Sequence, residues 1–393
     1  MPAVFRSPLF LVLALWFAGL GAAAQFAKIA VILPELQAFY GRDGAESGLL
    51  VSLISFMGVV LGIVAGIAAI RIGLRRLLIA ALALGAAVSL WQAAMPSFSV
   101  MLASRILEGL SHLAVVVTAP TLIARIAPPH RQGAALTLWG TFFSVAFAVT
   151  GLVAPAIIAA HGIGTLFAAH GLYMAAFAAL LAATLPQVSH DRNEGKWPTP
   201  GDIARRHAAV YSSPFIAAPA AGWLFYTMTF VSLLTLLPPL FEASVRPLAT
   251  AAMPLAAIAS SMLIGSALLR RMRAISVVLI GFSAAIVLSA GLIVVPGNLG
   301  IAVALFAALG LVQGASFATV PQLNDGLAEQ ALSNAGIAQM GNLGNMLGTP
   351  VAIAILSTIG YQGLPVFLIV CYAAAIALHV LLARRRATNP ATT

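Results

Sequence analysis

Residues 48–76 consist of the apolar run GLLVSLISFMGVVLGIVAGIAAI followed directly by the basic segment RIGLRR. A helix needs about 20 mostly apolar residues to cross the hydrocarbon core of a bilayer, and this run is long enough. Cationic side chains collect on the cytoplasmic side of a membrane, so Arg71, Arg75 and Arg76 orient the run. The stretch therefore predicts a membrane-spanning helix that ends in the cytoplasm.

The composition extends this interpretation to the whole chain of 393 residues. Hydrophobic residues make up 61% of the sequence and charged residues only 8%, whereas a soluble domain carries about 25% charged residues. Backbone groups in lipid must bond internally, so the apolar runs should be helices. We predict an all-α polytopic membrane protein with twelve spans, near residues 9–33, 48–70, 77–95, 100–123, 134–160, 165–185, 214–238, 249–269, 275–295, 299–321, 334–358 and 364–382.

The positions of the cations predict the orientation of the spans. With the amino terminus inside, the segments on the inner side hold sixteen of the twenty Lys and Arg residues, and the outer loops hold only Arg42 and Arg246. We therefore expect both termini in the cytoplasm, with the protein in the plasma (bacterial inner) membrane. The net charge of +10 suits loops that face an anionic leaflet. The Lys and Arg residues form no basic face, so nucleic acid is not an expected partner.

The domain organisation follows from a polar stretch near the midpoint. We predict a first six-helix half at 1–185, a cytoplasmic linker at 186–213 in which 202–211 can form a short surface helix, and a second half with a short tail at 214–393. The halves also repeat features in the same order. Repeated six-helix units are typical of carriers that work by alternating access. The matched pairs are Gly66 to Arg71 with Gly265 to Arg270, Glu108-Gly109 with Gln313-Gly314, and Gly133 with Gly336.

Two segments resemble signatures of the major facilitator superfamily. The family pattern Gly-x-x-x-Asp-Arg-x-Gly-Arg-Lys lies between its second and third helices, and this chain has Ile70 in place of the Asp. Its fourth helix carries Arg-x-x-Gln-Gly, which resembles Arg105-Ile-Leu-Glu108-Gly109. The resemblance implies twelve helices, a central cavity, alternating access and a monomer. It also implies a gating role for the matching loop residues Gly66, Arg71, Gly73 and Arg75.

Ionisable residues inside spans are the main candidates for function, because a charge in the membrane needs a reason. Lys28 follows Gln25 on one face of the first span, and it could bind an anionic group or extend to the outer interface. In the fourth span, Arg105, Glu108 and His112 share one helical stripe. Glu108 or His112 could carry a proton. The alternative is an Arg105–Glu108 ion pair that only orders the helix.

The second half offers neutral side chains instead. Its amides either contact substrate or join helices to one another. Two aromatic residues either line a cavity or pack against other side chains: Tyr226 in the seventh span and, in the first half, Trp139 in the fifth span. The amides are Gln313 in the tenth span and Gln339, Asn342 and Asn345 in the eleventh, the last three recurring every third residue.

Together these features predict a secondary transporter for a small organic solute. Two fixed cations against one acid favour an anionic or zwitterionic substrate, and the proton is the expected coupling ion. One alternative is a proton-driven efflux pump for apolar or cationic compounds, and another is a non-transporting membrane receptor or scaffold. The sequence contains no Walker loop, HExxH, CxxC or nucleophile elbow, so no enzyme, metal or cofactor is predicted.

Overall fold

The computed structural model describes residues 7–186 and 199–388. Packing contacts divide the chain into two compact units, of which the first comprises 1–42 and 64–197 and the second comprises 43–63 and 198–393. Among the described residues the regular elements are all helical, and twelve of them are long and apolar enough to cross a membrane. The predicted all-α fold with twelve spans is thereby confirmed. Arg6, Arg192 and Lys196, which contribute to the predicted charge pattern, lie outside the described residues.

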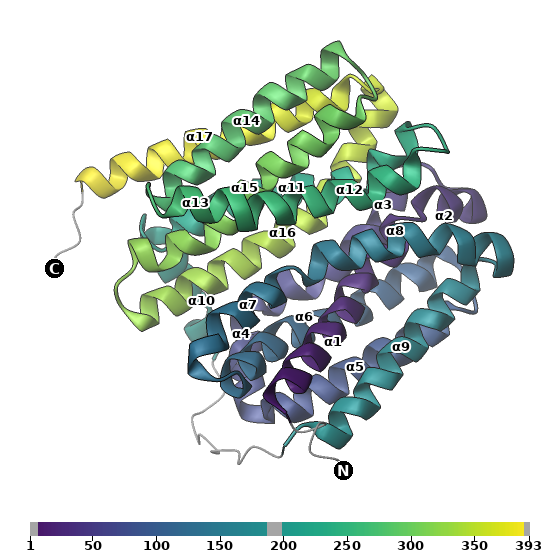
Figure 1. The fold of residues 1–393 in the computed structure, drawn as a ribbon, viewed down its shortest axis with the longest axis horizontal. Coiled ribbons are helices and arrows are strands. Elements are labelled where there is room, and N and C mark those ends of the chain that lie inside the picture. Colours follow the sequence, from purple (N-terminus) through teal and green to yellow (C-terminus); the bar gives the residue numbers. More distant parts are fainter. Residues whose placement is uncertain (1–6, 187–198, 389–393) are drawn as a thin grey trace. The chain divides into compact units, whose positions relative to one another are not determined.

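The first unit is built around α1, which contacts α6, α8 and α9 (Figure 1). This helix begins at Pro8, where the Ser7 hydroxyl accepts a hydrogen bond of 3.3 Å from the Phe10 amide. The short helix α2 follows and ends at Gly41 in a left-handed conformation with φ +61°. The helices of this unit are α1 (Pro8–Ala30), α2 (Leu33–Tyr40), the later part of α4 (Phe56–Ile72), α5 (Leu74–Gln92), α6 (Phe98–Ile126), α7 (Gln132–Gly140), α8 (Phe142–His161) and α9 (Ile163–Thr184).

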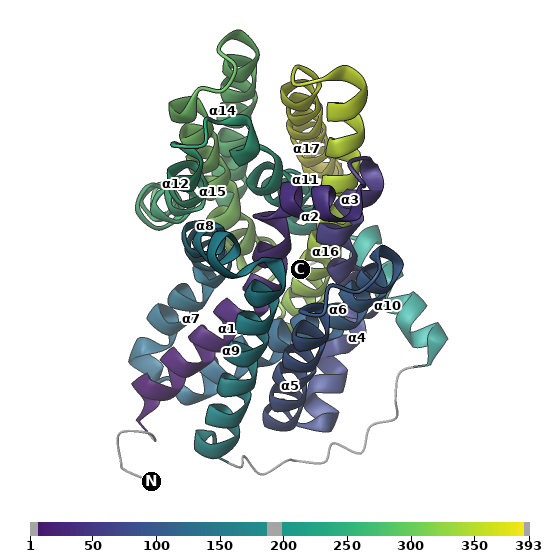
Figure 2. The ribbon, with the colours of Figure 1, turned by 90° about the vertical axis from the view of Figure 1, so that its right-hand side faces the viewer.

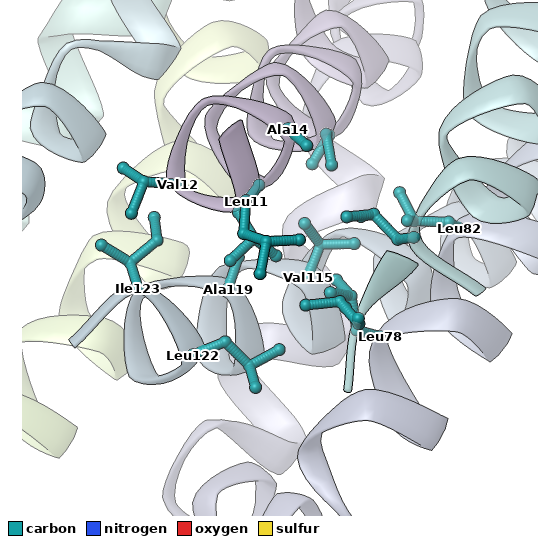
Figure 3. Packing of buried hydrophobic residues seen from close by; sticks show 14 of the residues in the cluster. Leu11, Val12, Ala14, Leu78, Leu82, Val115, Ala119, Leu122 and Ile123 are labelled. Atoms are coloured by element: carbon teal, nitrogen blue, oxygen red, sulfur yellow. The ribbon is translucent and has the colours of Figure 1, made fainter. Parts of the chain in front are cut away.

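One apolar core joins α1, α5 and α6 (Figure 3). Leu15, Leu82 and Val115 in this core are completely buried. Side chains from three helices interlock there, so the polar groups on the same helices are held in fixed positions. The residues labelled in Figure 3 are Leu11, Val12, Ala14, Leu78, Leu82, Val115, Ala119, Leu122 and Ile123.

The predicted span at 134–160 is interrupted in the structure. Helix α7 ends at Gly140 and α8 starts at Phe142, with Thr141 between them. The Thr141 hydroxyl donates to the Leu138 carbonyl at 2.7 Å and accepts a hydrogen bond from the Trp16 indole at 3.3 Å. These bonds replace part of the helical ladder at the break. Trp139 therefore lies on α7, whereas the later part of the predicted span forms α8.

The second unit combines residues 43–63 with the later part of the chain. Helix α11 packs against α15, α16 and α17, and α14 packs against α15 and α17 (Figure 1). The second span lies against α16 through α3 and the turn that follows it. The helices are α3 (Ala45–Ser52), the 3-10 turn Leu53–Ser55, the start of α4, α10 (Pro200–Ser212), α11 (Ala217–Leu236), α12 (Arg246–Ala259), α13 (Ser266–Leu269), α14 (Ala274–Val294), α15 (Leu299–Leu323), α16 (Leu327–Ile359) and α17 (Gly363–Thr388).

Helix α10 confirms the short helix expected near 202–211, and it packs against α16 (Figure 2). A capping box closes its first turn, because the Thr199 hydroxyl accepts from the Asp202 amide while the Asp202 carboxylate accepts from the Thr199 amide. The same contacts with Thr199 hold the pKa of Asp202 below its ordinary value. The cap gives the linker segment a fixed starting point on the second unit.

Close contacts between helix backbones hold α12 against α15. A Cβ atom added at Gly310 would lie only 2.1 Å from the carbonyl oxygen of Ala257. We expect Gly310→Ala to lower the free energy of unfolding by about 1–3 kcal/mol, because the two backbones must move apart. Thermal unfolding of the purified protein in detergent measures the effect.

Gly133→Ala is the matched control, since a Cβ atom at Gly133 meets nothing within 4 Å. It should leave the melting temperature nearly unchanged. Equal melting temperatures for the two variants would contradict the tight α12–α15 contact.

Candidate functional site: a buried charge cluster

Lys28 lies at the centre of a polar network inside the first unit. Its side chain is 1% exposed, and its ammonium group is 2.6 Å from Glu108 Oε1. The same nitrogen donates to Gln92 Oε1 at 2.8 Å and to the Ser89 hydroxyl. An ammonium group has three hydrogens, so these three acceptors use all of them. The lysine therefore does not extend to the membrane interface.

Arg105 and Glu108 form an ion pair one turn apart on α6. The pair joins Arg105 Nη1 to Glu108 Oε2, and both side chains are completely buried. A second guanidinium nitrogen of Arg105 donates to the Gln25 carbonyl of α1 at 2.9 Å. The carboxylate therefore lies between two cations from different helices, and its two oxygens each bind one of them.

Gln92 and Ser104 complete the contacts of the carboxylate. The Gln92 amide nitrogen donates to Glu108 Oε2 at 3.0 Å and to the Ser104 hydroxyl at 2.9 Å, while its oxygen accepts from Lys28. Gln92 ends α5 and Ser104 lies on α6. Neutral side chains thus orient the charged groups from both sides, as buried charges require.

His170 on α9 joins the network through a defined tautomer. Its Nε2 lies 2.9 Å from the Gly21 carbonyl, which can only accept, so this nitrogen carries the hydrogen. In the neutral ring Nδ1 is then an acceptor, 2.7 Å from the Ser89 hydroxyl and 3.4 Å from Lys28. The Phe167 ring on the same helix lies 5.0 Å from the ammonium and adds a cation–π contact.

We call Lys28, Ser89, Gln92, Ser104, Arg105, Glu108 and His170 the charge cluster. With the lysine and arginine cationic, the glutamate ionised and the histidine neutral, the cluster carries one net positive charge. Taking ions out of water is costly, and only close pairing with further hydrogen bonds repays that cost. The arrangement can therefore attract an anion or respond strongly to protonation of Glu108. No group of three or more His, Cys, Asp or Glu side chains in the described residues is placed to hold a metal ion.

The other candidates of the first unit lie beside the charge cluster. The Gln25 amide donates to the Ser111 hydroxyl at 3.0 Å, and Ser111 donates to the Ala81 carbonyl. His112 shares the α6 stripe, but its Nδ1 bonds to the Ala22 carbonyl at 2.9 Å and its ring packs edge-on against Phe26. Trp139 stacks on Phe142 and is 8% exposed.

In the second unit, Gln339 joins three segments of the chain. Its amide nitrogen donates to the Val59 carbonyl at 3.0 Å and to His207 Nε2 at 2.8 Å, and its oxygen accepts from Tyr211 at 2.6 Å. Burial raises the pKa of Tyr211 to about 12, so this hydroxyl keeps its hydrogen at neutral pH. These hydrogen bonds of Gln339 join α10 to α16, which is the helix-joining role that was one of the two alternatives for the amides.

The remaining second-unit candidates have separate surroundings. Tyr226 is buried in a row of rings and stacks on Trp223 and Phe230. Asn342 donates to the Ala338 carbonyl, and its side chain would block any Cβ atom at Gly58. Asn345 Oδ1 is buried and has no hydrogen-bond partner among the described residues. Gln313 is half-buried on α15.

The loop motif has a visible structural role at two of its four residues. Gly73 adopts φ +93°, a conformation that favours glycine, immediately before α5. Arg75 donates to the carbonyls of Ala182 and Leu185 at 2.5 and 3.0 Å, so it caps the end of α9. Gly66 is exposed within α4, and Arg71 lies in the last turn of the same helix. The gating role of the four residues stays a prediction.

Four members of the charge cluster were not expected from the sequence. Ser89, Gln92, Ser104 and His170 all lie within or at the ends of apolar spans. Ser89 and Gln92 stand one turn apart on α5, which was a usable signal. His170 is likewise an ionisable group inside an apolar span, which is a signal of function of the same kind as Lys28.

Removing the central carboxylate tests how the charge cluster is held. Glu108→Gln leaves Lys28 and Arg105 buried without a countercharge, so we expect a loss of about 3–5 kcal/mol in the free energy of unfolding. The double variant Glu108→Gln with Lys28→Met should recover part of the loss, because a buried cation is removed with its partner. Thermal unfolding in detergent of the single and double variants measures both effects.

Arg205→Gln is the matched control, because Arg205 pairs with Asp202 at the same i,i+3 spacing on an exposed surface. Its melting temperature should change little. A Glu108→Gln protein as stable as the Arg205→Gln protein would show that the buried pairing does not hold the first unit.

Comparisons with known proteins identify the family. The sequence matches the family model of the Major Facilitator Superfamily over residues 11–341, and no curated protein matches it. One similar solved structure is a crystal structure of a bacterial homologue of the human lysosomal transporter Spinster, in an inward-facing and unoccupied conformation. It matches with a TM-score of 0.71 and 15% sequence identity, and the match covers 97% of this chain and 98% of the homologue. The occupied form of that homologue matches with a TM-score of 0.70 and 14% sequence identity, over 95% of this chain and 96% of the homologue. A mutant of the nucleoside transporter NupG matches with a TM-score of 0.73 and 15% sequence identity, over 95% of this chain and 99% of NupG. The chain therefore belongs to the major facilitator superfamily and is an integral membrane transporter of a small-molecule substrate.

Proposed function

We propose that this transporter carries a small organic anion or zwitterion and couples its movement to protons through the charge cluster. The observation that carries the proposal is the complete burial of two cations around a single carboxylate, Glu108. The net positive charge of this arrangement favours a negatively charged group. Such a charge inside a membrane protein is costly and is kept for function.

The hydrogen bonds of Lys28 suggest how proton and substrate are linked. All three ammonium hydrogens are used, one of them by Glu108 Oε1 at 2.6 Å. Protonation of Glu108 removes its negative charge and releases a lysine hydrogen for another acceptor. A substrate carboxylate then restores the charge balance. Proton and anion should accordingly favour each other's binding, which is the thermodynamic requirement for symport.

Access to the charge cluster requires a change of conformation. Lys28 is 1% exposed, and Arg105 and Glu108 are completely buried. We infer that substrate reaches these side chains in another state of an alternating-access cycle. The amides Gln313, Gln339, Asn342 and Asn345 and the ring of Tyr226 stay candidates for further contacts with the substrate, as do Gln25 and Trp139. His112 stays a second candidate for carrying the proton.

We further propose a plasma-membrane location with both termini in the cytoplasm and a monomer as the working unit. The asymmetry of the cations supports this orientation, since the outer loops hold only Arg42 and Arg246.

Ligand binding at different pH values tests the linkage. A thermal-shift screen of organic acids, amino acids and drugs on the purified protein should find an anionic or zwitterionic ligand that binds more tightly as the pH falls. Lys28→Met should weaken that ligand about 10- to 100-fold, because a charge-assisted hydrogen bond is lost. Glu108→Gln resembles the protonated state, so its binding should no longer depend on pH. Arg205→Gln should bind like the wild type.

The row of rings formed by Trp223, Tyr226 and Phe230 favours one rival, an efflux pump for apolar or cationic compounds. In that case Lys28→Met would bind the screened compound normally, whereas Glu108→Gln would abolish resistance in cells. A receptor or scaffold would give no solute flux into proteoliposomes. Either result would end the anion proposal.

A further inference from the structure

The linker helix α10 docks on α16 through one of its faces (Figure 2). His207, Val210 and Tyr211 recur at helical spacing and so share that face. Val210 is completely buried, and a Cβ atom at Gly336 of α16 would lie only 2.8 Å from its Cγ1 atom. Nearly one turn further along α16, Gln339 binds both His207 and Tyr211. An apolar contact and two side-chain hydrogen bonds therefore hold α10 in place.

The second span fixes the orientation of the Gln339 amide. The Val59 carbonyl oxygen can only accept, and the atom of Gln339 that lies 3.0 Å from it must therefore be the amide nitrogen. The amide oxygen then accepts from the Tyr211 hydroxyl at 2.6 Å. An amide turned by half a rotation would place two oxygens against each other at the Val59 contact, so the assignment of nitrogen and oxygen is unambiguous.

This orientation determines the protonation state of His207. The Gln339 nitrogen can only donate, so His207 Nε2, which lies 2.8 Å away, must accept through its lone pair. The other ring nitrogen, Nδ1, lies 2.8 Å from the Ile203 carbonyl, one turn back on α10, and therefore carries the hydrogen. The docked arrangement thus requires a neutral imidazole with its hydrogen on Nδ1.

A proton added to His207 Nε2 would point a second donor at the Gln339 nitrogen. The amide cannot turn its oxygen toward the ring without losing the hydrogen bond to Val59. An imidazolium that faces an N–H group is a charged donor without an acceptor, which is costly for a half-buried side chain. We propose that His207 is a pH-sensitive latch: the neutral ring holds α10 on α16, and the protonated ring releases it.

The other ionisable groups of α10 keep their charge in the range where histidine ordinarily titrates, about pH 5 to 8. Contacts with Thr199 hold the pKa of Asp202 below its ordinary value, so this carboxylate remains ionised there. Burial raises the pKa of Tyr211 to about 12, so its hydroxyl remains neutral. The two arginines of the helix, Arg205 and Arg206, stay cationic. A change in docking over this range would therefore come from His207.

The elements packed against α10 offer His207 no countercharge. Helix α16 carries Glu329 in its first turn, ten residues before Gln339 and so about 15 Å away along the axis. Helix α11 carries Tyr226, and residues 56–63 at the start of α4 include no ionisable group. Among the described residues, the ring nitrogen Nε2 meets an amide rather than a carboxylate, so protonation gains no ion pair at this contact.

The latch would make the linker between the two predicted six-helix halves respond to the pH of the cytoplasm. This biological meaning rests on the proposed orientation of the protein, which places residues 186–213 inside the cell. The latch shares no residue with the charge cluster, and its test needs no substrate. A failure of the substrate proposal would therefore leave the latch unchanged.

Hydrogen–deuterium exchange of the full-length protein in detergent tests the latch. Helix α10 has 13 residues, a length at which an undocked helix is only marginally stable in water, so release should expose its amides to exchange. Peptides that cover residues 200–212 are followed by mass spectrometry at about pH 5.5 and about pH 7.5, with exchange times scaled for the intrinsic effect of pH. We expect protection of this segment to fall about tenfold or more at the lower pH, because a docking hydrogen bond is lost and a charged donor is left unpaired.

Three variants identify the group responsible. His207→Gln has no group at this position that titrates, so its protection should be the same at both pH values. Gln339→Leu removes the partner, so its protection should be low at both. Tyr211→Phe removes a docking hydrogen bond that does not titrate in this range, so protection should fall at both pH values while the wild-type pH dependence remains.

His130→Gln is the matched control, because His130 is an exposed histidine in the turn Pro129–Arg131 of the first unit. It should keep the wild-type response of α10 to pH. Equal protection of residues 200–212 at the two pH values in the wild type would overturn the proposal, as would an equal loss in the wild type and in His207→Gln. A wild-type pH response that persists in Gln339→Leu would also overturn it, because the hydrogen bond between these two side chains would then not be the latch.

Discussion

The first unit depends on the two ion pairs that the Glu108 carboxylate forms. The carboxylate binds Lys28 from α1 through one oxygen and Arg105 from its own helix through the other. Removing this group leaves two buried cations without a countercharge, which is strongly destabilising. The neutral partners Gln92 and Ser89 fix the geometry further by completing the hydrogen bonds of the ammonium. The apolar core of α1, α5 and α6 then holds these helices in the matching position.

The second unit is held in a different way. Its helices approach closely at glycines, as where Gly310 of α15 meets the backbone of Ala257. Apart from the buried imidazole of His379, its buried polar side chains are mainly neutral amides and hydroxyls. Gln339, for example, joins α10 to α16 and to the second span. One unit is therefore organised by paired charge and the other by close backbone contact and neutral oxygens. The sequence pattern of cations in the first half and amides in the second has a direct structural counterpart.

The fold was largely predictable because lipid imposes a simple rule on sequence. An apolar run long enough to cross the membrane must become a helix, and the structure has twelve helices of sufficient length and apolar character. Lys28, Arg105 and Glu108 were also recognisable, since each is a charge inside such a run. The partners Ser89 and His170 were missed because small hydroxyls and single histidines are common in helices. At the break, Thr141 accepts a hydrogen bond from Trp16, a residue far away in the chain, and the local sequence does not reveal this contact.

All three ammonium hydrogens of Lys28 are used in hydrogen bonds, and this has a practical consequence. An acylating reagent attacks a lysine only as a free amine with an open path, and this nitrogen is buried with all its hydrogens engaged. The sequence contains only one other lysine, Lys196, which can be replaced. In such a protein the rate at which Lys28 becomes chemically modified would time the opening of the first unit. With the amino-terminal amine blocked as well, Lys28 would be the only primary amine in the chain, so its modification would report directly on the exposure of this side chain.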